Sequence, residues 1–132
     1  MTNIATWCLL IAALMPIVCA GIAKWGTFAK PPSEGGYDNH QPRDWLARQQ
    51  GWRARANAAQ ANCFEVLPFF VGALLWAQLA DAPQHRMEVL AVGFVLLRVI
   101  YVALYLADRP GLRSAVWAAA LAVNIALLFA AA

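Results

Sequence analysis

Polar side chains that could do chemistry interrupt two apolar segments of this sequence. Asn62 and Glu65 lie near the start of the apolar segment 58–80, and Arg98 lies in the middle of the apolar segment 89–107. A charged side chain at the centre of a membrane-spanning helix costs about 2.5–3.5 kcal/mol on insertion scales. Glu65 and Arg98 therefore need polar partners, which are either each other or a bound ligand.

Helical periodicity gathers these residues, with several others, into two polar stripes. At about 100° per residue, Arg55, Asn62 and Glu65 fall within an arc of roughly 80°. The next apolar segment carries a similar stripe, made of Arg98, Tyr101, Tyr105 and Asp108. One interpretation is a buried ion pair between Glu65 and Arg98 that fixes the register of two helices. The other is a binding site for an anionic ligand that carries both carboxylates and an ammonium group.

The composition indicates which elements must position these side chains. The chain has 132 residues, of which 62% are hydrophobic and 13% are charged, and its mean hydropathy is +0.56. This excludes a water-soluble domain of ordinary composition. Apolar runs close to the ~20 residues that cross a bilayer as a helix predict spans at about residues 4–25, 56–80, 87–107 and 114–132. We therefore expect an all-α integral membrane protein, built as one four-helix bundle.

The positions of Lys and Arg predict the topology. The connection after the first span contains Lys24, Lys30, Arg43, Arg48, Arg53 and Arg55, and the connection before the last span contains Arg109 and Arg113. The remaining connection has only Arg86. Because short cytoplasmic loops are enriched in Lys and Arg, both termini are expected on the non-cytoplasmic side. The first span lacks a charged segment before it and a clear cleavage site, so we expect it to persist rather than to be removed as a signal peptide.

The residues between the first two spans divide at Pro42. The stretch before Pro42 is rich in Pro, Gly, Asn and Asp and has no period, which predicts a loop. From Pro42 onward the residues favour helix and only Gly51 interrupts them, so the second helix is expected to begin at Pro42 and to enter the membrane near Ala58. Trp45 and Trp52 are its expected anchors at the membrane interface.

Several other kinds of site are not expected. His40 and His85 lie in predicted loops on opposite sides of the membrane, which argues against a metal site, and no nucleic-acid-binding pattern is present. The cysteines are odd in number and fall inside predicted spans, so we expect structural thiols and no disulfide framework. They are Cys8, Cys19 and Cys63.

Two motifs carry a resemblance to a known family. The stretch QANCFEVLP places Asn62, Glu65 and Pro68 at the spacing N-x-x-E-x-x-P, and RVIYVALYLADRPGLRSAVW follows later in the chain. Together they resemble the MAPEG superfamily, the membrane-associated proteins in eicosanoid and glutathione metabolism. The loop GGYDNHQPR resembles its small bacterial branch. The resemblance covers nearly the whole chain.

The resemblance implies a homotrimer in a bacterial inner membrane, with glutathione bound between neighbouring subunits in the cytoplasmic half of the bilayer. Glu65 would accept from the glutathione ammonium group, and Asn62 would hydrogen-bond the peptide backbone or a carboxylate. Tyr101 and Tyr105 would line the peptide, and Arg98 would support the site. A lipophilic small molecule would be the second substrate.

The resemblance also implies an arginine beside the glutathione sulfur. Arg109 and Arg113 both match the family position, because the turn DRPG leaves the register open. We favour Arg113, since Arg109 immediately precedes the helix-breaking Pro110.

One departure from the family pattern bears on function. Many family enzymes carry an arginine four residues before the asparagine, where it holds a glutathione carboxylate, and this chain has Ala58 there. Arg55, one turn away on nearly the same face, is a candidate substitute. The sequence therefore predicts a glutathione-dependent transferase or peroxidase, with a non-catalytic lipid-binding protein or accessory subunit as the alternative. A transporter is disfavoured, because the chain has no pair of broken helices.

Overall fold

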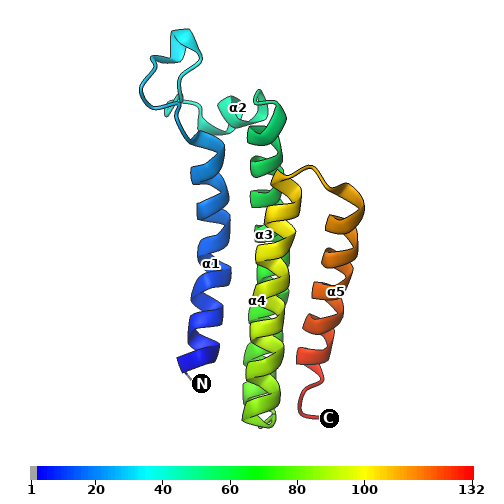
Figure 1. The fold of residues 1–132 in the computed structure, drawn as a ribbon. Coiled ribbons are helices and arrows are strands. Elements are labelled where there is room, and N and C mark those ends of the chain that lie inside the picture. Colours follow the sequence, from blue (N-terminus) through cyan, green and yellow to red (C-terminus); the bar gives the residue numbers. More distant parts are fainter. Residues whose placement is uncertain (1–2) are drawn as a thin grey trace.

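The computed structural model describes residues 3–132 and is all-helical, as the sequence predicts (Figure 1). Within that range, four helices are long and apolar enough to cross a membrane. They are α1 (Asn3–Lys24), α3 (Gly51–Leu79), α4 (Gln84–Leu106) and α5 (Pro110–Leu128). The short α2 (Pro42–Ala47) and the 3-10 turn η1 (Pro32–Glu34) lie between α1 and α3.

Small side chains let the long helices pack closely. Helix α3 contacts the other three long helices, and α4 packs against α1 and α5. Much of the core where they meet is alanine and cysteine, with a stacked pair formed by Phe70 and Phe94 whose ring centroids are 4.3 Å apart. Interfaces of this kind are typical of helices in lipid, where close backbone approach replaces the hydrophobic driving force.

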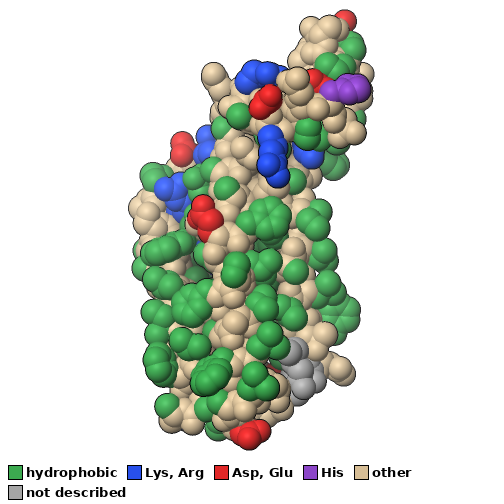
Figure 2. Space-filling model, turned by 180° about the vertical axis from the view of Figure 1, so that it is seen from behind, with side chains coloured by type: hydrophobic (Ala, Val, Ile, Leu, Met, Phe, Trp, Pro, Cys, Tyr) green, Lys and Arg blue, Asp and Glu red, His purple; other side chains and the backbone are tan. Residues whose placement is uncertain are grey.

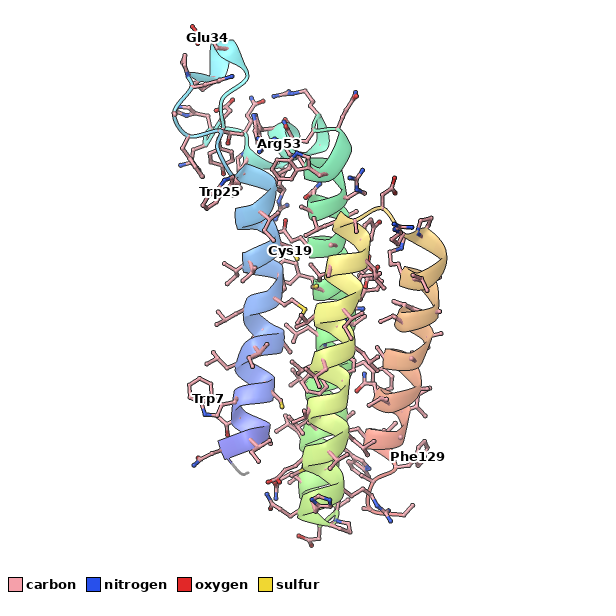
Figure 3. The ribbon with its side chains drawn as sticks, in the orientation of Figure 1. Trp7, Cys19, Trp25, Glu34, Arg53 and Phe129 are labelled. Atoms are coloured by element: carbon pink, nitrogen blue, oxygen red, sulfur yellow. The ribbon has the colours of Figure 1, made fainter. Side chains whose placement is uncertain are left out.

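The outer surface of the bundle is apolar. Trp7 on α1 is 62% exposed and Leu79 at the end of α3 is 77% exposed. Figure 3 shows Trp7 and Phe129 pointing away from the bundle. Large exposed apolar surface is costly in water, whereas it is the natural surface of a protein in a bilayer.

The second predicted helix is divided in the structure. Helix α2 begins at Pro42 as expected but ends at Ala47, and α3 begins anew at Gly51. The expectation of one continuous helix is wrong, because Gln50 is extended and Gly51 has φ of +61°, a left-handed conformation that glycine adopts without strain.

Side-chain contacts attach the start of α3, and the residues that precede it, to the end of α1. Arg53 of α3 donates to the carbonyls of Ala23 (3.0 Å) and Trp25 (2.7 Å) at the end of α1. Figure 3 shows Arg53 lying between these two helices. Trp45 of α2 is buried and meets the edge of Tyr37 at 5.2 Å between ring centroids. These contacts fix the segment that leads into α3.

Charge is distributed unevenly along the bundle. On the face shown in Figure 2, Lys and Arg gather around the end that carries α2, and hydrophobic side chains cover most of the rest. The start of α1 and the C-terminus lie at the opposite end (Figure 1). The side of the membrane on which each end lies stays a prediction from the charge rule.

The connection between α4 and α5 is a tight turn. Asp108 has φ of +56°, and the Arg109 amide donates to the carbonyl of Leu104 at 3.0 Å. The chain therefore reverses within a few residues. The reversal places the last turns of α4 beside the first turns of α5.

Candidate functional site

A hydrogen-bonded chain of three polar side chains links α3 to α4. Arg98 Nη2 donates to Asn62 Oδ1 at 2.7 Å, and Asn62 Nδ2 donates to Glu65 Oε2 at 3.1 Å. Among the residues that the structure describes, no direct ion pair joins Glu65 to Arg98. The structure thus brings together the polar residues that the sequence singles out, but Asn62 lies between the two charges.

Arg98 is an unusual residue in this chain because it is buried with unused donors. Its side chain is 2% exposed, and within residues 3–132 its Nε and Nη1 have no hydrogen-bond partner. An arginine has five N–H donors, and Nη2 alone is engaged, by Asn62 and by the sulfur of Cys63 at 3.7 Å. The guanidinium therefore keeps both a positive charge and free donors inside the bundle.

Two tyrosine rings lie between two arginines on the way from Arg98 toward the α4–α5 turn. The Arg98 guanidinium lies 4.1 Å from the centroid of Tyr101, and Arg113 lies 4.2 Å from the centroid of Tyr105. The two tyrosine rings meet edge to face at 5.7 Å. Cation–π contacts of this kind hold the guanidinium groups in place while leaving N–H donors available.

Two adjoining cavities open beside these residues. The outer cavity, near the α4–α5 turn, has a volume of about 230 Å³ and is lined by Asn62, Tyr101, Arg113, Ser114 and Trp117. The inner cavity, also about 230 Å³, is lined by Asn62, Glu65, Val66, Phe69, Phe94, Arg98, Trp117, Ala120, Leu121 and Asn124. The two cavities share Asn62 and Trp117, so a single elongated ligand could extend through both.

Two of the predicted arginines lie outside these cavities. Arg55 Nε donates to the carbonyl of Leu106 at 3.2 Å, which ties α3 to the end of α4. Arg109 is exposed at the residue that precedes α5. Of the two candidates for the arginine beside sulfur, the geometry brings Arg113 and not Arg109 to the tyrosines. Ala58 lines neither cavity.

The α5 side of the cavity wall was not predicted from the sequence. Trp117 and Asn124 of α5 line the inner cavity, and Asn124 is 2% exposed with no partner for Oδ1 among the described residues. A signal was present: Trp117 follows Arg113 by four residues and Asn124 follows Trp117 by seven, which places all three on one face of a helix.

Nothing in the described residues gathers metal ligands. Within residues 3–132 no group of three or more His, Cys, Asp or Glu side chains is close enough to hold an ion. The polar groups of the site are one carboxylate, amides, phenols and guanidinium groups. This set suits an organic ligand with several charges.

Comparison with known proteins places the chain in a family. A family model described as the MAPEG family matches residues 4–132, nearly the whole chain. The chain belongs to the MAPEG family. As a MAPEG protein with four long apolar helices, it is an integral membrane protein, related to proteins of glutathione and eicosanoid metabolism. No curated protein and no solved structure matches it significantly.

Proposed function

We propose that this MAPEG protein binds glutathione in the two adjoining cavities and uses it on lipophilic electrophiles. The observation that carries the proposal is the arrangement of Glu65, Asn62 and Arg98 in one hydrogen-bonded chain, with Arg113 at the other end of the same cavities. Glutathione has an ammonium group, carboxylates and a thiol, so it needs an anion, hydrogen-bond donors and cations at separate points. The site offers all three.

Each group of the peptide has a partner in this arrangement. Glu65 is exposed to the cavity and accepts from Asn62 through one carboxylate oxygen, which leaves further acceptor capacity for an ammonium group. Arg98 lines the inner cavity, and its positive charge suits a carboxylate or a peptide carbonyl. Tyr101 and Arg113 line the outer cavity, where the thiol would lie.

The chemistry follows from stabilising the thiolate. Lowering a thiol pKa by two units from about 8.5 takes roughly 2.7 kcal/mol of preferential stabilisation. The guanidinium of Arg113, which is held against Tyr105, can supply this stabilisation of the thiolate in a partly dry cavity. The thiolate then attacks an electrophile that enters from the bilayer, and a carbon–sulfur bond forms as the leaving group departs. No protein nucleophile is required.

The assembly that we propose with this activity is a homotrimer in a bacterial inner membrane, with both termini on the non-cytoplasmic side. The clustering of basic residues around α2 supports this orientation. The trimer would bring a neighbouring subunit against the open side of the cavities.

One observation favours a second candidate, a lipid-binding family member without catalysis. Ala58 cannot hold a carboxylate, and the Nε of the possible substitute Arg55 is engaged by the Leu106 carbonyl. A lost hydrogen bond to a charged group costs about 1.5–3 kcal/mol. An enzyme lacking it would need the charge of Arg98 as compensation.

The two candidates differ in a direct assay. Glutathione is added to the purified, detergent-solubilised protein, the ultraviolet absorbance of the thiolate is followed, and a model aryl halide is then supplied. The proposal expects a thiolate signal at neutral pH and conjugate formation. A folded, trimeric preparation that gives neither would refute catalysis and leave the lipid-binding alternative.

Glu65→Gln tests the ligand role itself. The substitution keeps the shape and removes the charge that would meet the ammonium group, so glutathione affinity should fall by about tenfold or more while the trimer and the unfolding midpoint stay unchanged. Glu88→Gln is the matched control, because Glu88 accepts from Gln84 at 2.7 Å on the opposite end of the bundle and should leave affinity unaltered. If Glu65→Gln mainly unfolds the bundle, the carboxylate has a structural role instead.

A further inference from the structure

Two thiols meet where α1 packs against α3. Cys19 of α1 is 1% exposed and Cys63 of α3 is 3% exposed, and they share one buried cluster with Met15 and Ala59. Figure 3 shows Cys19 pointing from α1 into the bundle. Both thiols are free in the structure, and the glutathione chemistry proposed above uses neither.

The neighbour of this pair is a cation with unused donors. Arg98 Nη2 lies 3.7 Å from Cys63 Sγ, and the Nε and Nη1 of Arg98 have no hydrogen-bond partner among the described residues. The thiolate, not the thiol, is the form that attacks a peroxide, and a guanidinium in contact with sulfur stabilises it. Cys63 is therefore the sulfur with the surroundings of a nucleophile, and Cys19 is placed to resolve its oxidised form.

Space for a small oxidant exists on both sides of the pair. A void of about 10 Å³ lies against Cys63, Arg98 and Met15, close to the volume that one water molecule requires. Hydrogen peroxide has two oxygen atoms, so this void must widen to admit it. On the outer surface, Cys19 lines an apolar groove of about 340 Å³ between α1 and α4. Because this groove lies against Cys19, it is the side from which a small oxidant dissolved in the bilayer would approach the pair.

We propose that Cys19 and Cys63 are a redox-active dithiol that a hydroperoxide converts to a disulfide joining α1 to α3. The Cys63 thiolate attacks the terminal oxygen of the hydroperoxide, the O–O bond breaks, and Cys63 becomes a sulfenic acid while the hydroperoxide is reduced to an alcohol or to water. The Cys19 thiol then attacks the sulfenic sulfur, the S–S bond forms and water leaves. In total, two thiols and one hydroperoxide give one disulfide, one water and one alcohol, or two waters when the oxidant is hydrogen peroxide.

The third cysteine supplies a matched control. Cys8 lies on α1 like Cys19 and is also buried. The two are separated by roughly 16 Å along the helix at 1.5 Å per residue, too far for a disulfide, whose Cα atoms are about 4.4–6.8 Å apart. Cys8 should therefore stay reduced while Cys19 and Cys63 of the same chain are oxidised.

The test uses the full-length protein in lipid nanodiscs and requires no glutathione, so its outcome is independent of the proposed function. The protein is treated with hydrogen peroxide, denatured, alkylated with iodoacetamide and analysed by mass spectrometry. We expect only Cys8 to be alkylated and a linked peptide pair to contain Cys19 and Cys63. Dithiothreitol should restore alkylation of both.

Substitutions separate this outcome from adventitious oxidation. Cys8→Ser should form the same linkage as the wild-type chain, whereas Cys19→Ser and Cys63→Ser should form none. Cys19→Ser should in addition accumulate Cys63 as the sulfenic acid, which dimedone traps. Full alkylation of Cys19 and Cys63 after peroxide treatment, or oxidation of Cys63 to sulfinic acid in the wild-type chain without linkage to Cys19, would overturn the proposal.

Discussion

Replacing Asn62 by Leu tests the buried polar chain that organises the site. Leucine has nearly the shape of asparagine but accepts no hydrogen bond, so Arg98 would lose its 2.7 Å contact with Asn62. Among the described residues, Nε and Nη1 are already without hydrogen-bond partners, so the guanidinium would keep the Cys63 sulfur at 3.7 Å and the Tyr101 ring at 4.1 Å. The substitution therefore leaves a buried cation without an oxygen acceptor.

The expected cost of Asn62→Leu is about 1.5–3 kcal/mol, the value of a hydrogen bond to a charged group. This exceeds the ~0.6 kcal/mol average of interhelical hydrogen bonds in membranes, because the partner here is ionised and cannot reach water. Asn124→Leu is the matched comparison on α5. Asn124 is 2% exposed and its Oδ1 has no partner among the described residues, so its replacement should be neutral or stabilising.

The assay is reversible unfolding of the detergent-solubilised protein by sodium dodecyl sulfate, followed by tryptophan fluorescence. The free energies of unfolding should rank Asn62→Leu below the wild-type chain, and Asn124→Leu at or above it. A stability of Asn62→Leu within about 0.5 kcal/mol of wild type, the range of an ordinary surface substitution, would refute the reasoning. So would a larger loss from Asn124→Leu than from Asn62→Leu.

Two further predictions concern the arginine beside the sulfur and the break before α3. If Arg113 supplies the ~2.7 kcal/mol of thiolate stabilisation, Arg113→Gln should raise the pKa of the bound glutathione thiol by about two units. A pH titration of the thiolate absorbance should then shift to higher pH in Arg113→Gln and stay in place in Arg109→Gln. Equal shifts in both variants would contradict the assignment. Gly51 has φ of +61°, so Gly51→Ala should destabilise the protein by about 1–2 kcal/mol. By contrast, Gly72→Ala should stabilise the protein by about 0.5–1 kcal/mol, because Gly72 lies inside α3 and an added Cβ meets nothing within 4 Å. Equal effects of the two alanines in the same unfolding assay would contradict this prediction.

The sequence was sufficient to predict the helices because a segment inserted in a membrane can adopt few other structures. A run of about 20 apolar residues must satisfy its backbone internally, so it forms a helix irrespective of its neighbours. The four long helices follow from this constraint alone. The break before α3 did not follow, since a single glycine is tolerated within many helices and the sequence does not show that Gly51 has a positive φ.

The polar residues of the candidate site on α3 and α4 were predictable from the sequence, but their connections and the α5 wall were not. The helical period placed Asn62 and Glu65 on one face of α3, and Arg98 with the tyrosines on one face of α4. Which side chains touch depends on the rotation and depth of each helix relative to the next, and neither quantity is encoded in the period of one helix. Arg55 shows the difference, because it shares the stripe with Asn62 yet donates to the Leu106 carbonyl instead of facing the cavities.

What the sequence by itself determined is therefore the class of the protein, its helices, its family resemblance and the residue types available for binding. The tertiary structure decided that Asn62 lies between Glu65 and Arg98, that Arg113 rather than Arg109 meets the tyrosines, and that Cys19 meets Cys63 across two helices. The physical reason is that polar groups inside a bilayer find their partners across helix interfaces. Those interfaces form only when the packing of small side chains sets how closely, and at which rotation, the helices approach one another.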